Sequence, residues 1–454
     1  MKKIFVFILS LSGFAPLYAQ NSGSDTTSLT FKEAVSLAVK NNVVLQKQEN
    51  ELEFSQAQKA SGIASLGPSV ELNGYMSRND GNSFNQQEGR VINGKLDYMN
   101  ASVDVQMALF NGFNRVNTMR QRNLLVDYQA YASKRSKQLA IQQVVAQYLQ
   151  CLLDRELNYI DKNNLEAQQQ KLEQITEQVK AGSIAEVDQY NQTYQVKNAE
   201  LAVLRSKNTL VNDKAALALM IQKNPADPFV LVEPGWELDE VQNLDLNELY
   251  QKAIENRADL KSAEAFERAS HLGYKAAQGF YYPSLYAFYS YGSAYNYVHA
   301  SAAIPDPANR SFEQQFTKDN TQTVYGLSLN VPIFNGLRTR TNVSRAKIDK
   351  ENAELDAENT KLQIKSDVLS AYQNLNDAVN AYLVSQTQLE AAEVSFELES
   401  ERNRLGISDL VQYTQANQDY LTAKNDAAQA KYTLMFQNLL LEYAIGTLQF
   451  ESIP

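Results

Sequence analysis

The stretch SVDVQMALFNG at residues 102–112 decides the fold, together with its counterpart GLSLNVPIFNG at residues 326–336. In both, apolar and polar residues alternate, and the alternation ends at an Asn-Gly pair. Such alternation over about ten residues is typical of a strand with one lipid-facing and one water-facing side. A half-buried sheet of a soluble protein gives the same pattern. In a membrane barrel, the polar residues of these stretches would line the lumen: Asp104, Gln106, Ser328 and Asn330.

The two stretches belong to an internal repeat, which is the strongest feature of the sequence. Phe110-Asn111-Gly112 recurs 224 positions later as Phe334-Asn335-Gly336. The opening LTFKEA, which begins at Leu29, recurs 215 positions later as LDLNEL, which begins at Leu244. Each copy reads as helix, strand, loop, strand, long helix, turn and helix. We therefore predict a first repeat at residues 20–225, a linker at 226–243, a second repeat at 244–450 and a tail at 451–454.

The first half of each repeat predicts a helix followed by a strand hairpin. Residues 31–65 have a helical pattern, and Pro68 then ends the helix, because proline lacks the backbone N–H. We expect residues 79–97 and 297–321, both polar, to be loops outside the cell, and we expect the last strand to continue through Ile333. A cluster of aromatic residues fits either a membrane-interface girdle or an ordinary strand core. It consists of Tyr286, Phe288, Tyr289 and Tyr291.

The second half of each repeat predicts an unusually long helix. Neither Gly nor Pro occurs between Gly112 and Gly182, or between Gly336 and Gly406. A helix of that length would reach roughly 100 Å, since each residue adds about 1.5 Å. Globular domains rarely use such helices. We therefore expect them to pack side by side with those of other subunits.

The N-terminus predicts export. Lys2 and Lys3 precede the apolar run Ile4–Leu11, and Ala19 ends a plausible cleavage site, which gives a signal peptide at residues 1–19. The run is too short for a membrane anchor helix, and no later stretch approaches the length of a transmembrane helix. No cysteine lies near the cleavage site, so we expect no N-terminal lipid anchor.

Composition argues against several functions. The net charge of −10 does not suit nucleic acid, which binds basic surfaces. Cys151 is the only cysteine, and its spacing from Val144 and Tyr148 predicts a buried apolar position rather than a reactive thiol. His271 and His299 are the only histidines, and the sequence lacks metal-binding, nucleophile and phosphate-loop motifs. We predict neither catalysis nor a cofactor or metal.

The repeated openings, the Pro-Ser strand entries and the Pro332–Gly336 junction resemble the TolC-like outer-membrane efflux family. The resemblance covers roughly residues 29–450. It implies an α+β membrane protein of the outer membrane that extends into the periplasm. Each subunit of a homotrimer would contribute four strands to one shared transmembrane β-barrel. Its long helices would form a periplasmic α-barrel of coiled coils.

The resemblance also implies partners and contact residues. Relatives dock onto a periplasmic adaptor, also called a membrane fusion protein, and onto an inner-membrane transporter of the RND or ABC type, while the barrel contacts outer-membrane lipid. The adaptor would touch the turns at Gly182, Ser183, Gly406 and Ile407, although helix termination alone also explains the glycines. The acidic entrance constriction of relatives falls on Gln412 and Gln415 here. The nearest carboxylates are Asp409 and, at the other turn, Glu186 and Asp188.

These features predict an exit duct that passively conducts small molecules out of a tripartite efflux pump. A type I protein-secretion duct has the same fold, and no residue separates the two functions. A periplasmic coiled-coil stalk without a pore is a third hypothesis. It would explain the helices but not the duplicated alternating strands.

Overall fold

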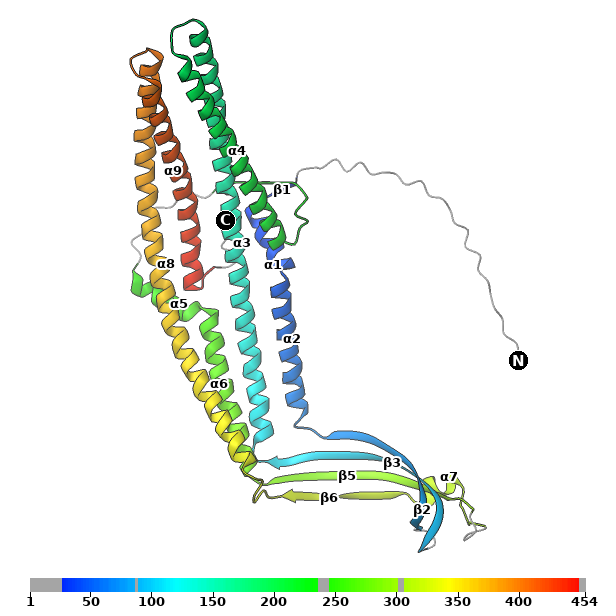
Figure 1. Ribbon diagram of the computed structural model, residues 1–454. Helices are drawn as coiled ribbons and strands as arrows, with labels where there is room; N and C mark the ends of the chain where they lie inside the picture. Colours follow the sequence, from blue (N-terminus) through cyan, green and yellow to red (C-terminus); the bar gives the residue numbers. More distant parts are fainter. Residues whose placement is uncertain (1–26, 86–88, 236–244, 301–305, 449–454) are drawn as a thin grey trace, which may run out of the picture.

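The computed structural model describes residues 27–85, 89–235, 245–300 and 306–448. The molecule is elongated, with a four-stranded sheet at one end and two long helical hairpins at the other (Figure 1). The first repeat contains β1 (Thr27–Leu29), α1 (Phe31–Asn41), α2 (Val43–Ala64), β2 (Ser69–Asn85), β3 (Arg90–Asn111), α3 (Asn114–Lys180) and α4 (Glu186–Met220), and β4 (Phe229–Leu231) follows it.

The main helices and the long strands of the second repeat follow the same order. This repeat contains α5 (Leu246–Asn256), α6 (Ala258–Gln278), the 3₁₀ turn η1 (Gly279–Tyr281), β5 (Ser284–Val298), α7 (Phe312–Gln314), the π-helical turn η2 (Gln315–Asp319), β6 (Gln322–Asn330), α8 (Arg338–Arg404) and α9 (Leu410–Ile445). The predicted signal peptide and C-terminal tail lie outside the described residues. The segment predicted as a linker includes β4, which pairs in parallel with β1.

The prediction of one helix over residues 31–65 is wrong, because the chain breaks at Asn42. Thr30 and Glu33 form a reciprocal capping box that begins α1. Asn42 then adopts an extended conformation, and its Oδ1 accepts hydrogen bonds from the backbone N–H groups of Val44 (2.8 Å) and Leu45 (3.2 Å). Asparagine favours this N-cap role over a helix interior, so a second helix, α2, begins. The second repeat breaks at the matching place, Arg257.

The four long strands form one antiparallel sheet in the order β2-β3-β5-β6, and the β3–β5 pair joins the two repeats. The loop predicted at residues 79–97 is wrong for most of its length, because β2 continues to Asn85 and β3 begins at Arg90. Polar side chains pair across these strands: Arg78 Nε donates to Asp97 Oδ1 (2.6 Å), and Asn93 Nδ2 donates to Asn82 Oδ1 (2.7 Å). The polar residues therefore do not mark where the two strands end and the loop begins.

The last strand is shorter than predicted, since β6 ends at Asn330 rather than at Ile333. Pro332 cannot donate a hydrogen bond to a neighbouring strand. In the first repeat Ala108 occupies the matching position, and β3 continues to Asn111 with a register shift between Ala108 and Phe110.

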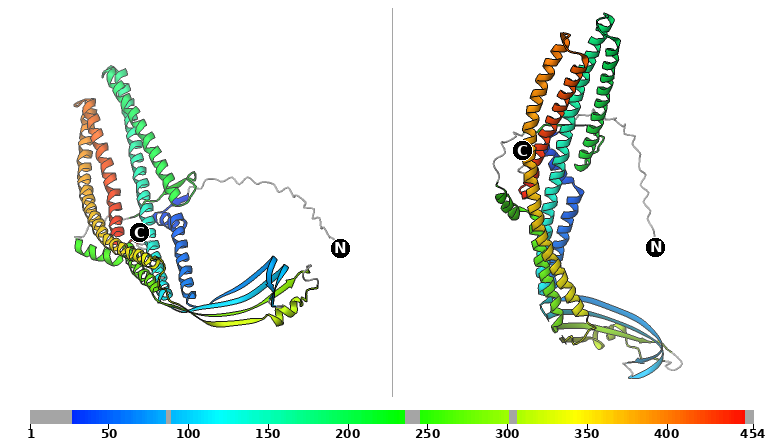
Figure 2. Two further views of the ribbon diagram at one scale, coloured as in Figure 1. Left: turned by 60° about the horizontal axis from the view of Figure 1, so that its bottom comes forward. Right: turned by 60° about the vertical axis from the view of Figure 1, so that its left-hand side comes forward.

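The two long helices agree with the prediction, and each has 67 residues. At about 1.5 Å per residue, each extends roughly 100 Å. Helix α3 packs against α1, α2, α4, α6 and α9, whereas α8 packs against α5, α6 and α9 (Figure 2). No helix among the described residues has an apolar stretch sufficient to cross a membrane.

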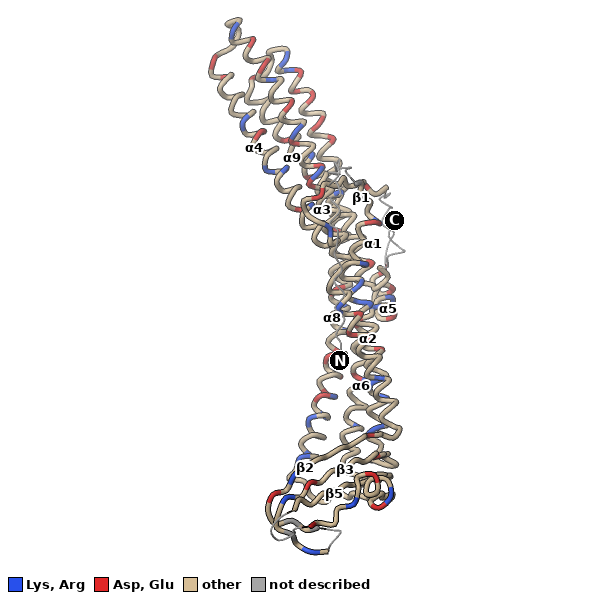
Figure 3. The backbone as a smooth tube through the Cα atoms, turned by 90° about the vertical axis from the view of Figure 1, so that its right-hand side faces the viewer, with Lys and Arg blue, Asp and Glu red and all other residues tan. Residues whose placement is uncertain are grey.

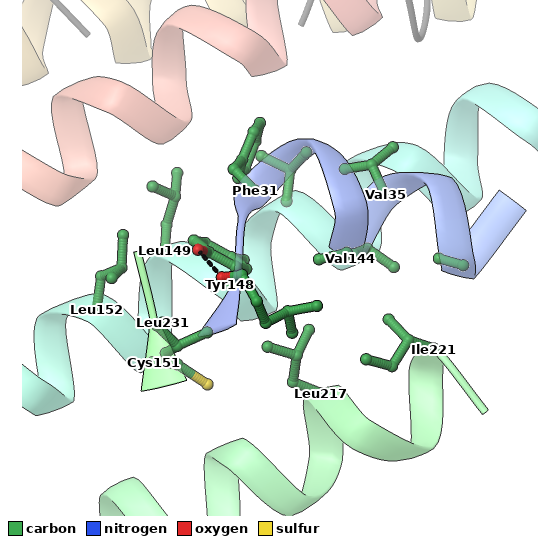
Figure 4. Close-up of a cluster of buried hydrophobic side chains, with 14 of the residues drawn as sticks. Phe31, Val35, Val144, Tyr148, Leu149, Cys151, Leu152, Leu217, Ile221 and Leu231 are labelled. Carbon is green, nitrogen blue, oxygen red and sulfur yellow. Dashed lines mark hydrogen bonds between the residues drawn. The ribbon is translucent and has the colours of Figure 1, made fainter. Parts of the chain in front are cut away.

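The largest buried cluster lies where α1, α3 and α4 meet the β1–β4 pair (Figure 4). At its centre, the fully buried Tyr148 donates its hydroxyl to the backbone oxygens of Leu29 (2.9 Å) and Val232 (2.7 Å). Cys151 is also fully buried there, as predicted, and burial raises the pKa of its thiol to about 12. This thiol is therefore a packing group.

Candidate functional site: the polar face of the sheet and the helical turns

One face of the four-stranded sheet is apolar and exposed. The strand register aligns Leu72 of β2 with Val103 of β3, and Val103 with Tyr291 of β5. Leu72 is 79% exposed, although it is a large apolar residue. A contiguous exposed surface of this kind fits lipid better than water. Its exposed members include Val70, Leu72, Met76, Val103, Tyr289, Tyr291, Leu327 and Leu329, and the half-buried Met99 and Val105 lie on the same face.

The opposite face is polar and holds all four residues predicted to line a lumen. Asp104 and Gln106 lie on β3, opposite Ser290 and Phe288 of β5. Ser328 pairs with Tyr286, and Asn330 pairs with Ser284, so these two residues occupy the same face on β6. The structure thus brings the predicted residues together on one surface.

Asp104 is held by three strands. Asn73 of β2 and Ser102 of β3 donate side-chain hydrogen bonds to Asp104 Oδ2, at 2.8 and 2.7 Å. Ser290 of β5 donates its hydroxyl to Asp104 Oδ1 at 2.5 Å. Glu71 lies directly opposite Asp104 in the register and adds a second carboxylate to this face. Glu71 was not among the predicted site residues, although the alternation of β2 places it on the polar side.

Charges are sparse across the middle of the sheet. Neither β5 nor β6 contains a charged residue, and Glu71 and Asp104 are the only ones in residues 69–77 and 98–111. Both lie on the polar face. In Figure 3 the blue and red charged residues are spread along the helices, whereas much of the sheet is tan. The apolar face therefore carries a charge-free band.

An ionic cluster marks one border of that band. Beyond Met76, on the apolar face, Arg78 pairs with Asp97, and His299 Nε2 lies 2.8 Å from Asp97 Oδ2. Lys95 and Asp80 form a further pair at 3.6 Å. Charged groups accumulate where a membrane-facing surface meets the polar headgroup region.

The four aromatic residues do not form one girdle. Tyr289 and Tyr291 lie on the apolar face, opposite Val105 and Val103. Tyr286 and Phe288 point to the polar face instead, and the Phe288 ring packs over Gly326. Of these four residues, only Tyr289 and Tyr291 therefore lie on the face that suits a membrane interface.

The two helical turns lie at the end of the molecule remote from the sheet (Figure 1). Gly182 and Gly406 have φ angles of +70° and +73°, which glycine adopts readily. The N–H of Ser183 bonds to Gln178 O, and the N–H of Ile407 bonds to Arg402 O, which closes each helix. These four residues, predicted to contact an adaptor, are all exposed.

The residues predicted to constrict the entrance lie at the start of α9 and are exposed. Asp409 is the N-cap of α9, and its Oδ1 accepts a hydrogen bond from the Gln412 N–H at 2.8 Å. Gln415 donates its side-chain amide to Asp419 Oδ1 at 2.8 Å. Glu186 and Asp188 occupy the first turn of α4 in the other hairpin. The carboxylate of Asp409 therefore has a capping role that sequence alone did not reveal.

Metal chemistry has no support within the described ranges, which contain no cluster of three or more His, Cys, Asp or Glu side chains suited to an ion.

Comparisons with known proteins agree with this geometry. The sequence matches the family model for outer membrane efflux proteins over residues 34–221 and 249–447. The outer membrane protein TolC of Salmonella enteritidis is 22% identical over 298 residues, and that of Escherichia coli K12 is 21% identical over 296 residues. Each match covers 63% of this chain and 57% of the relative.

Solved structures share the fold at lower identity. The CmeC outer membrane channel of Campylobacter jejuni superimposes with a TM-score of 0.80 at 17% identity, covering 97% of this chain and 94% of CmeC. The outer membrane protein VceC of Vibrio cholerae gives 0.78 at 14% identity, covering 92% and 96% of the two chains.

The chain belongs to the outer membrane efflux protein family. It is an outer-membrane protein that extends into the periplasm. Membership of this family favours a duct over a coiled-coil stalk without a pore.

Proposed function

We propose that this protein is the exit duct of a tripartite efflux pump and passively conducts small molecules to the outside of the cell. The polar face of the sheet carries this proposal. Asp104, Gln106, Ser328 and Asn330 share that face, while the reverse face is apolar and free of charge along its central band. A sheet with these two faces suits the wall between lipid and a water-filled lumen.

The duct would be a homotrimer. Strands β2 and β6 are the edges of a four-stranded sheet, and an unpaired edge is not tolerated in lipid. Three copies would supply twelve strands to one closed barrel. The long helices would continue the barrel as a periplasmic tunnel.

The periplasmic end would receive substrate from other proteins. The turns at Gly182, Ser183, Gly406 and Ile407 are exposed and project farthest from the sheet, which suits contact with a periplasmic adaptor. Asp409, Gln412 and Gln415 would line the tunnel entrance nearby. An inner-membrane transporter of the RND or ABC type would supply the energy.

Two measurements test this function. The purified protein should conduct ions in a planar lipid bilayer, and cells lacking it should accumulate a fluorescent efflux substrate. Exchange of the turns at residues 181–184 and 405–408 for unrelated helical turns should abolish efflux and leave the bilayer conductance intact. Absence of conductance from correctly inserted protein would refute the duct.

A further inference from the structure

The start of α8 is a basic segment without acidic residues. Residues 320–348 contain no Asp or Glu, and their four basic residues, Arg338, Arg340, Arg345 and Lys347, all lie near the start of α8. Lys347 forms an ion pair at 3.3 Å with the glutamate one turn later. The three arginines are exposed, and their side chains form no ion pair with any described residue. This segment therefore presents three uncompensated positive charges.

The matching segment of the first repeat is also basic, but its charges are engaged. At the start of α3, Arg115 Nη1 donates to the backbone oxygen of Ser65 at 2.7 Å, and Arg122 Nη1 donates to that of Gln58 at 3.1 Å. Both acceptors lie at the C-terminal end of α2. Helix α6 packs on α8 as α2 packs on α3, yet α6 accepts no hydrogen bond from the arginines at the start of α8. These arginines are therefore available to a ligand.

A hollow of about 230 Å³ lies between the end of α6 and the start of α8. Arg340 is the only charged residue in its lining, and most of the other lining residues are apolar or aromatic. Ile333 is 94% exposed and Phe334 is 80% exposed, although apolar side chains of this size are usually buried. The hollow thus combines one unpaired cation with an uncovered apolar wall. That wall consists of Phe280, Tyr281, Ile333, Phe334 and Leu337.

The hollow adjoins the apolar face of the sheet, at the end where the strands meet the helices (Figure 1). Leu327 and Leu329 lie on this face of β6, and Val331 and Ile333 continue the alternation in the sequence after the strand ends. The ionic cluster around Arg78 marks the opposite border of the face. At such borders, basic and aromatic side chains contact lipid headgroups. Because the helices extend into the periplasm, the border at the hollow meets the periplasmic leaflet.

We propose that this hollow binds the headgroup of an anionic phospholipid in the periplasmic leaflet of the outer membrane, with Arg340 as the ligand of its phosphate. The proposal rests on the proposed function, in which the apolar face of the sheet contacts lipid, and it adds which class of lipid binds and which residue holds it. Sites that enclose a drug-sized ligand have about 300–1,000 Å³. The hollow is smaller, so it accepts the headgroup while the acyl chains lie along the apolar face.

The chemistry of the hollow selects a headgroup with net negative charge. A guanidinium binds a phosphate through two parallel hydrogen bonds, a geometry that a lysine ammonium cannot match. Arg338 and Arg345 add positive charge nearby, and no acidic residue within 320–348 offsets it. A zwitterionic phospholipid brings its own ammonium group, which these cations repel. An anionic phospholipid therefore binds more tightly at this position.

A tryptophan in the hollow tests the site with two lipids of different charge. Trp236 is the only tryptophan, so the variant Trp236→Phe/Tyr281→Trp carries a single reporter in the same hollow as Arg340. The assembled protein is reconstituted into mixtures of phosphatidylglycerol and phosphatidylcholine, with bromine on the acyl chains of one lipid or the other. Bromine quenches a tryptophan that it contacts, so the two mixtures report which lipid occupies the hollow. We expect about a fivefold preference for phosphatidylglycerol, the effect of one basic side chain at an anionic lipid surface.

Variants of the arginines separate a binding site from general attraction by charge. Arg340→Gln, added to the reporter, should bring the preference close to one. Arg345→Gln is the matched control and should keep most of the preference, because it removes an exposed, unpaired charge from the same helix but outside the hollow. Arg340→Lys retains the charge without the two parallel hydrogen bonds, so its preference should be intermediate.

Inorganic phosphate distinguishes the source of the phosphate group. Excess phosphate at constant ionic strength should leave the quenching unchanged, because a free anion lacks the acyl chains that the apolar wall contacts. Loss of the lipid preference on adding phosphate would instead identify a free anion as the ligand and overturn the proposal.

Three further results would overturn the lipid site. They are equal quenching by the two lipids in the reporter protein, an equal preference in Arg340→Gln and Arg345→Gln, and no quenching by either lipid. If Arg340→Gln does not assemble, added salt decides, since a preference that salt does not weaken cannot come from this exposed arginine. In each case a protein that still conducts in a planar bilayer leaves the proposed duct intact. A protein that neither contacts lipid nor conducts refutes the proposed function as well.

Discussion

The two repeats share the order of their main helices and strands, but different interactions stabilise their corresponding positions. Between the two short helices of the first repeat, the partly buried Asn42 caps α2 and makes the break. In the second repeat, the matching position is Arg257, which is 3% exposed and bonded to Asp259, Asp367 and the backbone oxygen of Ala444. The first break is local, whereas the second is tied to α8 and α9. Duplication therefore preserved the fold while each copy acquired its own interactions.

The largest effect should come from breaking the buried interactions of Arg257. Arg257→Met should lower the free energy of unfolding by about 3–5 kcal/mol, because Asp367 would lose its cationic partner and Asp259 would be left with Arg135, at 3.5 Å. The counterpart change, Asn42→Ala, removes one helix cap and should cost only about 1 kcal/mol. Denaturant unfolding in detergent measures both, and equal losses would contradict the comparison.

A second difference concerns the buried carboxyl group of Asp154, whose counterpart position in the second repeat is apolar. Asp154 is 3% exposed on α3, and its repeat counterpart on α8 is Ala378. Burial, together with the facing carboxyl of Asp213, raises the pKa of Asp154 to about 7. The folded state thus holds a proton that the unfolded state has already lost, so stability should fall as the pH rises from about 4 to about 7.

Asp154→Asn should remove that slope and stabilise the protein by about 2–4 kcal/mol at pH 8. Thermal unfolding measured from pH 4 to pH 8 checks the sign. Persistence of the same pH dependence in Asp154→Asn would assign it to another group.

The junctions that follow β3 and β6 are unevenly covered: a Cβ added at Gly112 would lie 2.2 Å from Gly279 O, whereas one added at its counterpart Gly336 would meet no described atom within 4 Å. This difference predicts a third, smaller effect. Gly336→Ala should lower the temperature at which the multimer dissociates, because its Cβ would meet the neighbouring copy. Gly182→Ala is the matched control. It has a similar positive φ and equally open surroundings, and it therefore bears the same backbone strain of about 1 kcal/mol. Equal dissociation temperatures for the two variants would mean that nothing packs against Gly336.

The smallest effect concerns ion preference. The first repeat contributes Glu71 and Asp104 to the polar face, whereas their counterparts in the second repeat are the uncharged Tyr286 and Ser328. Rings of like charge set the selectivity of a pore. Glu71→Gln should lower the ratio of cation to anion permeability roughly two-fold, and Ser328→Asp should raise this ratio. Reversal potentials across a salt gradient measure both changes, and an unchanged ratio would place these residues outside the lumen.

Much of the candidate site was accessible from sequence because alternation fixes which face a strand residue occupies. Asp104, Gln106, Ser328 and Asn330 share a face for that reason alone. Alternation could not reveal that Asp104 accepts hydrogen bonds from three strands, because that depends on which strands are neighbours and in what register. The capping role of Asp409 was missed because a cap depends on the backbone conformation at the helix start.

By itself, the sequence determined the periodic features of this protein: the duplicated strands, the two 67-residue helices and the order of elements in each repeat. These follow from backbone periodicity and from the absence of Gly and Pro, which act within a few residues of the chain. Only the tertiary structure decided that Arg257 bonds to both α8 and α9 and that Asp154 faces Asp213. It also decided that β2 and β3 continue through polar residues. The first two depend on side chains far apart in sequence, and the third depends on pairing between neighbouring strands, which polarity along one strand does not reveal.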